Sequence, residues 1–350
     1  MVELTTTRNN PLIDPALHVW GWEIPLYLFL GGVVAGMMVF AGLAMLRVAK
    51  GEDPRRFLSV QTPLLAFLLL NLGMLVLLLD LAHPLYVWAV YLTFEPASPM
   101  SWGSWVLLVV YAILLVSAVV RLHEAWPWLG RSLPVVRRWS DAIAGSPSRM
   151  ALLGWINVVF GAAVGIYTGI LLNTMVARPL WNTAVLPVLF LVSGLSAGAA
   201  AMHLATRFFG RRPAPQGMVA GFVAALAQPL GGEPPEKGTV DALLRADVVL
   251  LAVEFVLLLL LVLGLVTSTA SHAQAAQLVL GGPYTLAFWG AIVAAGILVP
   301  IVLQSLELSH RIPHTIVPAL LVLAGGYVLR WVMVNAGQLS EVVQASARWP

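Results

Sequence analysis

The sequence contains no cysteine and few charged residues. Without cysteine the protein can form no disulfide and can bind no thiolate-ligated iron–sulfur cluster, so any such cluster must belong to a partner. Only 10% of the residues are charged, against about 25% in an ordinary soluble domain. With 60% hydrophobic residues, the composition excludes a surface that faces mainly water and indicates a lipid environment.

Long apolar runs support this interpretation, because a helix needs about 20 apolar residues to cross the hydrocarbon core of a bilayer. Eight such runs predict an all-α integral membrane protein with eight transmembrane helices. They cover 24–46, 63–79, 102–120, 150–176, 183–206, 248–268, 283–306 and 312–334. We expect the second to continue past Asp80 to about Leu92, and we interpret the shorter apolar stretch 218–230 as an interfacial or re-entrant segment.

Basic residues are concentrated in every second loop, and this pattern predicts the orientation of the protein in the membrane. Fifteen of the nineteen lie in the loops after the first, third, fifth and seventh runs, and the other four are Arg8, Arg178, Arg330 and Arg348. By the positive-inside rule both termini are periplasmic. The chain then divides into a periplasmic segment 1–23 that is retained, a transmembrane domain 24–338 with a cytoplasmic loop 207–245, and a periplasmic tail 339–350. Because the charge is sorted by membrane side, we predict a lipid partner and no nucleic acid.

Glycines four residues apart occur on three of the predicted helices. They are Gly32 and Gly36, then Gly161, Gly165 and Gly169, then Gly194 and Gly198. Such spacing allows close helix packing in lipid. Phosphate-binding glycine motifs follow a strand, and no strand is predicted, so nucleotide binding is excluded.

Polar side chains gather at the predicted periplasmic level of the first four helices. They are Glu23, Tyr27, Asp80, His83, Ser101, Trp102, Tyr167 and Thr168. Hydrogen-bonding groups for two ring oxygens, an apolar mouth and a titratable group are what a quinone site needs, and a low-dielectric setting favours the protonated carboxyl. Simpler interpretations stay open: Asp80 as a solvated helix end, His83 as an interface residue, and Tyr27 and Trp102 as part of an aromatic belt.

The sixth helix carries two carboxylates, Asp247 and Glu254, seven residues apart and therefore on one face. They predict either a proton relay toward the cytoplasm or structural interhelical bonds. We expect Glu307, His310 and Arg311 to be solvated. His203 alone among the histidines lies well inside a span, and we expect it to make an interhelical hydrogen bond.

Several segments resemble the NrfD family of membrane subunits. They are 22–32 (WEIPLYLFLGG), 80–84 (DLAHP), 98–105 (SPMSWGSW), 167–172 (YTGILL) with 179–181 (PLW), 189–195 (LFLVSGL), and 325–330 (GGYVLR) with 335–338 (NAGQ). The resemblance covers nearly all of 22–338 in order. It departs at Ala82, where the family usually has glycine, and in the basic segment 210–238, which matches no known function.

The resemblance implies eight helices in two four-helix bundles in the bacterial inner membrane, and a quinone or quinol, menaquinone or ubiquinone, bound near the periplasmic face. It implies electron exchange with a four-cluster ferredoxin-like iron–sulfur subunit, a molybdopterin-containing catalytic subunit beyond it, and no haem or independent activity in this chain. It assigns quinone contacts to the Tyr167 region and the start of the first helix, and the carboxylate to Asp80.

Two other functions compete with this one. A cytochrome b-type subunit would need histidines paired across helices to bind haem. A secondary transporter would place its polar groups near the middle of the membrane, whereas these gather toward one face, and we expect no metal site.

Overall fold

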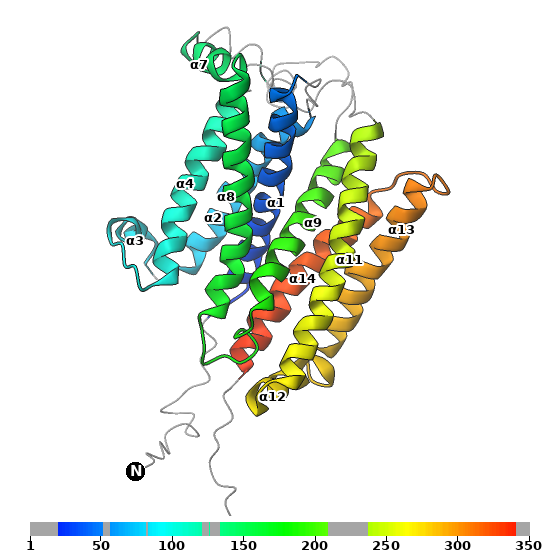
Figure 1. Cartoon of the computed structure of the whole chain (residues 1–350). Coiled ribbons are helices and arrows are strands. Elements are labelled where there is room, and N and C mark those ends of the chain that lie inside the picture. The colour runs from blue at the N-terminus through cyan, green and yellow to red at the C-terminus, as the bar shows by residue number, and fades with distance from the viewer. Residues whose placement is uncertain are drawn as a thin grey trace, which may run out of the picture.

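The computed structural model describes residues 20–51, 57–81, 83–120, 126, 134–208 and 237–340 (Figure 1). In these ranges every element of regular secondary structure is a helix. The elements are α1 (Glu23–Ala49), η2 (Phe57–Gln61), α2 (Thr62–Asp80), η3 (Pro84–Tyr86), α3 (Val87–Leu92), α4 (Pro99–Val120), α7 (Pro134–Ala144), α8 (Pro147–Asn173), α9 (Val185–Thr206), α11 (Lys237–Thr267), α12 (Ala270–Leu280), η5 (Leu286–Leu298), α13 (Val299–Leu308) and α14 (Val317–Leu339).

Eight helical spans within the described residues are long and apolar enough to cross a membrane, which confirms the predicted number. They are α1, η2 with α2, α4, α8, α9, α11, η5 with α13, and α14. Successive spans run in opposite directions (Figure 1). We call the end where α1 begins at Glu23 and α14 finishes at Leu339 the terminal end, and the end with Ala49 and Val317 the opposite end. The interfacial segment predicted at 218–230 lies outside the described residues.

The second span does not continue to Leu92 as expected. Helix α2 stops at Asp80, Leu81 has extended backbone angles, and the chain resumes as the short η3 and α3. Pro84 explains the break, because proline has no N–H for the helix ladder and pushes the preceding residue out of the helical region. His83 has φ −131° and ψ 74°, so Asp80 lies at a helix end.

The glycines four apart confirm the predicted packing seams. A Cβ atom added to Gly198 of α9 would lie 2.7 Å from Cα of Gly36 on α1, and one added to Gly194 would lie 3.2 Å from Cα of Gly32. On α8, a Cβ at Gly161 would lie 2.8 Å from the carbonyl oxygen of Ala35. Helix α1 therefore packs closely along both α8 and α9, and it connects the first four spans to the last four.

Candidate functional site

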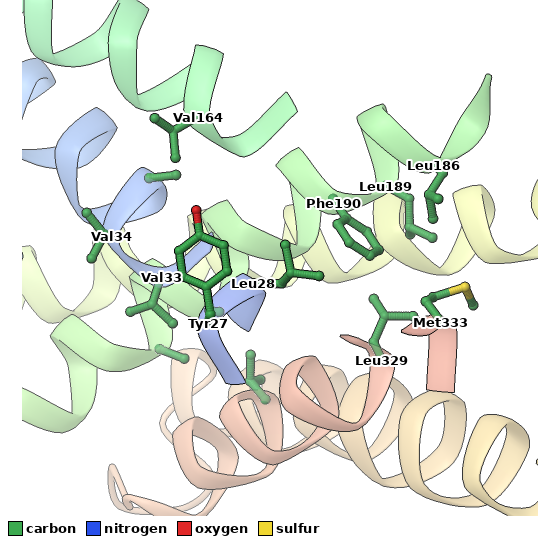
Figure 2. Packing of buried hydrophobic residues seen from close by; sticks show 14 of the residues in the cluster. Tyr27, Leu28, Val33, Val34, Val164, Leu186, Leu189, Phe190, Leu329 and Met333 are labelled. Atoms are coloured by element: carbon green, nitrogen blue, oxygen red, sulfur yellow. The ribbon is translucent and has the colours of Figure 1, made fainter. Parts of the chain in front are cut away.

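A small apolar pocket lies among α1, α2, α4 and α8. Three hydroxyl-bearing side chains, Tyr27, Tyr167 and Thr168, line it together with Gly31 and Gly73, and its other walls are Val and Leu side chains. Figure 2 shows the Tyr27 ring packed among buried aliphatic side chains, with its hydroxyl pointing toward the side of Val164. The pocket thus combines hydrogen-bonding groups with an apolar lining.

The three hydroxyls differ in their bonding. Tyr167 donates a hydrogen bond of 2.9 Å to the carbonyl oxygen of Pro99, and Thr168 donates one of 2.8 Å to the carbonyl oxygen of Gly165. The Tyr27 hydroxyl has no hydrogen-bond partner among the described residues. Tyr27 is consequently the hydroxyl that remains available to donate to a ligand, while the other two retain lone pairs that can accept.

Two carboxylates lie at the terminal end. Glu23 begins α1, one helical turn before Tyr27, and Asp80 ends α2; both are half-buried and lie within electrostatic range of each other. Tyr91 on α3 lies within electrostatic range of Tyr27, and sequence reasoning did not select it. Neither carboxylate lines the pocket itself.

Three other predicted residues lie outside the pocket lining. His83 is exposed and its ring lies 6.3 Å from that of Tyr86. Ser101 is buried but accepts a hydrogen bond of 3.0 Å from the backbone N–H of Glu95, and the Trp102 indole donates one of 2.7 Å to the carbonyl oxygen of Pro96. Both residues stabilise the turn that leads into α4.

Asp247 is buried on α11 and fully hydrogen-bonded. Its Oδ1 accepts a bond of 2.5 Å from the Ser196 hydroxyl on α9, and its Oδ2 accepts one of 2.6 Å from the side-chain amide of Gln304 on α13. The carboxylate therefore connects three helices in the interior.

Glu254 belongs to a second buried group that includes Arg330 of α14. The Ser193 hydroxyl donates to Glu254 and accepts from Nη1 of Arg330, so it connects the two charges. Arg330 also donates 3.1 Å bonds to the carbonyl oxygens of Phe190 and Gly326, and its guanidinium lies 5.0 Å from the centre of the Phe190 ring. An arginine that is 1% exposed in a membrane span requires such partners.

Arg330 also lies close to the stretch of α1 that forms part of the pocket wall. A Cβ atom added to Gly32 would lie 3.1 Å from Nη2 of Arg330, and the preceding residue, Gly31, lines the pocket. Two neighbouring residues of α1, both without a side chain, thus lie against the pocket and against Arg330.

Arg330 and Glu307 correct two expectations. Arg330 was counted with the basic residues outside the membrane, and Glu307 was expected to be solvated, yet they are 1% and 0% exposed. For Arg330 the signal was present, because it falls inside the predicted span 312–334 and an ionisable residue within a span is a functional candidate. Gln304, Ser193 and Ser196 were missed, since uncharged polar residues give no comparable signal. Among the described residues, no group of three or more His, Cys, Asp or Glu side chains is placed to bind a metal.

These features define a multi-pass α-helical membrane protein with ionisable groups buried between its spans. The family model described as polysulphide reductase, NrfD, matches residues 9–342. The chain therefore belongs to the NrfD family and is a multi-pass protein of the bacterial inner membrane.

The curated relatives include proteins named as parts of reductases. The sequence is 30% identical to a polysulfide reductase chain from Wolinella succinogenes over 331 residues, which cover 91% of this protein and 94% of that one. It is 28% identical to protein NrfD of Escherichia coli over 331 residues, 92% and 96% of the two proteins. It is also 27% identical to a selenate reductase subunit from Mesobacillus selenatarsenatis over 212 residues, 55% and 48% of the two proteins.

Proposed function

We propose that this protein is the quinone-reactive membrane subunit of a bacterial respiratory oxidoreductase. In this proposal it exchanges electrons between menaquinone or ubiquinone in the membrane and a periplasmic four-cluster, ferredoxin-like iron–sulfur subunit. A molybdopterin-containing subunit beyond that protein carries out the terminal reaction. The relatives named as parts of polysulfide and selenate reductases support this role. The protein would have no activity without its partners.

The pocket is the observation that carries the proposal. Its residues fit a quinone, because the unpartnered hydroxyl of Tyr27 can donate to a ring oxygen and the aliphatic walls suit an isoprenoid tail. Tyr167 and Thr168 offer acceptors for the hydroxyls of the reduced ring. We propose His83, Ser101 and Trp102 as groups that shape the entrance at the terminal end. Reduction of a bound quinone to the quinol takes up two electrons and two protons.

Asp80, with Glu23 beside it, is proposed as the proton-exchanging group. The negative charge of Glu23 within electrostatic range disfavours the ionised form of Asp80 and so helps it to hold a proton. A half-buried carboxyl at a helix end also keeps access to water. Asp80 can therefore accept a proton released at the pocket and pass it to the terminal end.

The orientation belongs to the proposal as well. With Arg330 inside the membrane, only Arg8, Arg178 and Arg348 remain on the side of the termini, so the bias of basic residues toward the opposite end becomes stronger. We place the terminal end in the periplasm and arrange the spans as two four-helix bundles, α1, α2, α4 and α8 against α9, α11, η5 with α13, and α14 (Figure 1). Asp247 and Glu254, in the second bundle, are proposed to transfer protons between the pocket and the cytoplasm.

The experiment that tests this function is Asp80→Asn in the complex purified with its partner subunits. The amide keeps the shape of the side chain but exchanges no proton, so quinol-linked electron transfer should fall by about 10²- to 10⁴-fold, the range for removing a positioned acid or base. Glu95→Gln, an exposed carboxylate at the same end, is the matched control and should retain full activity. Near-normal quinol activity of Asp80→Asn would refute the role of Asp80.

A further inference from the structure

A second cluster of titratable side chains lies at the opposite end, where α9, α11, α13 and α14 meet. We call it the opposite-end cluster, and it consists of His203, Asp241, Glu307 and His314. His314 lies between two carboxylates, with Nε2 3.5 Å from Oδ1 of Asp241 and Nδ1 3.6 Å from Oε2 of Glu307. Glu307 and His314 both lie within electrostatic range of His203.

His203 and Glu307 of the cluster are buried, and the cluster is poorly hydrogen-bonded. His203 is 2% exposed, and neither of its ring nitrogens has a hydrogen-bond partner among the described residues, so the interhelical hydrogen bond expected of it is not made there. Oε2 of Glu307, Oδ1 of Asp241 and Nδ1 of His314 are also buried without a hydrogen bond there. A buried polar group without a hydrogen bond costs about 1–3 kcal/mol. Several such groups at one place are difficult to explain by packing. They are what a site needs if it binds and releases a ligand.

The ligand that imidazole and carboxylate groups share at neutral pH is the proton. The side chain of His314 is 26% exposed and can meet water, whereas Glu307 is fully buried behind it. The other charged groups nearby are basic: Arg207 of α9 lies within electrostatic range of His203 and donates to the carbonyl oxygen of His314, and the exposed His310 and Arg311 follow α13. A metal ion does not suit the site, because no metal-binding group of side chains is present in the described ranges.

The cluster also connects to the interior carboxylates. Gln304 precedes Glu307 by three residues on α13, so the two side chains share a helix face, and Gln304 donates to Asp247 at 2.6 Å. Glu254 lies seven residues after Asp247 on α11, about 10 Å along the helix axis. From Glu254 the polar contacts reach Arg330 through Ser193, and Arg330 lies against Gly32 next to the pocket.

We propose that the opposite-end cluster is a proton-exchange site that supplies the interior carboxylates from the aqueous phase opposite the quinone pocket. His314 takes a proton from water and transfers it to the Glu307 carboxylate, which leaves a neutral imidazole and a neutral carboxyl. The proton then leaves Glu307 toward Asp247 and Glu254, and the steps run in reverse when the pocket releases protons. No electron moves in the cluster. This inference rests on the proposed quinone function, whose two electrons require two protons.

The test uses the complex with its partner subunits in proteoliposomes, with a short-chain quinol or quinone as substrate and a pH-sensitive dye on the side of the opposite end. Glu307→Gln keeps an Oε1 that accepts from the N–H and hydroxyl of Thr315, both 2.9 Å away, so the loop before α14 should persist. We expect turnover to fall by about 10²-fold and the dye signal per electron to be lost. Asp141→Asn, which removes an exposed carboxylate of α7 at the same end, is the control and should behave as the wild type.

A double variant decides whether the groups act in series. If Glu307 and Glu254 lie on one route, Glu307→Gln with Glu254→Gln should be no slower than the slower single variant, whereas independent effects multiply. Multiplied effects, a normal dye signal in Glu307→Gln, or turnover that requires Na⁺ and moves no protons would overturn the inference. If Glu307→Gln does not assemble, His314→Gln decides in the same way. A wild-type complex that does not react with quinones would instead refute the proposed function.

Discussion

Tyr27 is the pocket residue whose hydroxyl is free, and this sets it apart from Tyr167 and Thr168. Tyr27→Phe should therefore remove one hydrogen bond to a quinone analogue and nothing from the fold. A neutral hydrogen bond contributes about 0.5–1.5 kcal/mol, so binding of a quinone-site inhibitor should weaken by about 2- to 10-fold. Tyr86→Phe, at an exposed tyrosine outside the pocket, is the control in the same titration. Equal inhibitor affinity of the wild type and Tyr27→Phe would exclude a bond to Tyr27.

Arg330 and Glu254 compensate each other in the interior, with Ser193 between them. Arg330→Gln leaves the carboxylate buried without its cation, a change that costs about 3–5 kcal/mol. Arg330→Gln combined with Glu254→Gln removes both charges and should recover much of the lost stability, measured as the free energy of unfolding in detergent micelles. If the double variant is as unstable as Arg330→Gln alone, Glu254 does not depend on this arginine.

At the scale of residues, the sequence predicted how deep in the membrane a side chain lies, but it did not predict toward which neighbouring helix the side chain points. Counting along each span placed Tyr27, Tyr167 and Thr168 at one level, and they do line one pocket. The same count selected Trp102, which is 47% exposed. Depth does not fix the rotation of a helix about its axis, and helices that are apolar all round give little amphipathic pattern to reveal it. The partners of Asp247 were likewise hidden, because they come from helices far apart in the sequence.

At the scale of elements, apolar length predicted the number of spans, and glycine spacing predicted close packing seams, one of which the structure places between α1 and α9. Gly198→Ala should destabilise the protein by about 1–3 kcal/mol, the cost of overpacking, because the new Cβ would meet the backbone of Gly36. Gly264→Ala on α11, where nothing lies within 4 Å, is the matched control and should be neutral or stabilising. The measurement is the unfolding temperature in detergent. Equal unfolding temperatures of the two variants would mean that the seam tolerates a methyl group.

Helix ends were harder to predict than helix number. Hydropathy continues through Tyr86, Trp88 and Leu92, so it gave no sign that α2 stops at Asp80; the sign was Pro84, a local backbone constraint. Helix α11 begins at Lys237, whereas the apolar run predicted a start at residue 248. The prediction missed the first turns because they carry the charged residues Asp241 and Arg245. These polar first turns are where Asp241 meets His314. Function at the opposite end thus lies in the part of the helix that a hydropathy criterion omits.

For the whole molecule, the proposals require the terminal end to face the periplasm and the opposite-end cluster to face the cytoplasm. The protein has no cysteine, so single cysteines can report this orientation without background. Ala97→Cys and Gln274→Cys, at exposed positions of the terminal end, should react with an impermeant thiol reagent added to intact spheroplasts. Ser148→Cys, exposed at the start of α8 at the opposite end, should react only after permeabilisation, because basic loops remain in the cytoplasm. The unmodified protein is the control and should give no labelling. The reverse order of reactivity would place the pocket near the cytoplasm, and the iron–sulfur partner would then have to bind on that side.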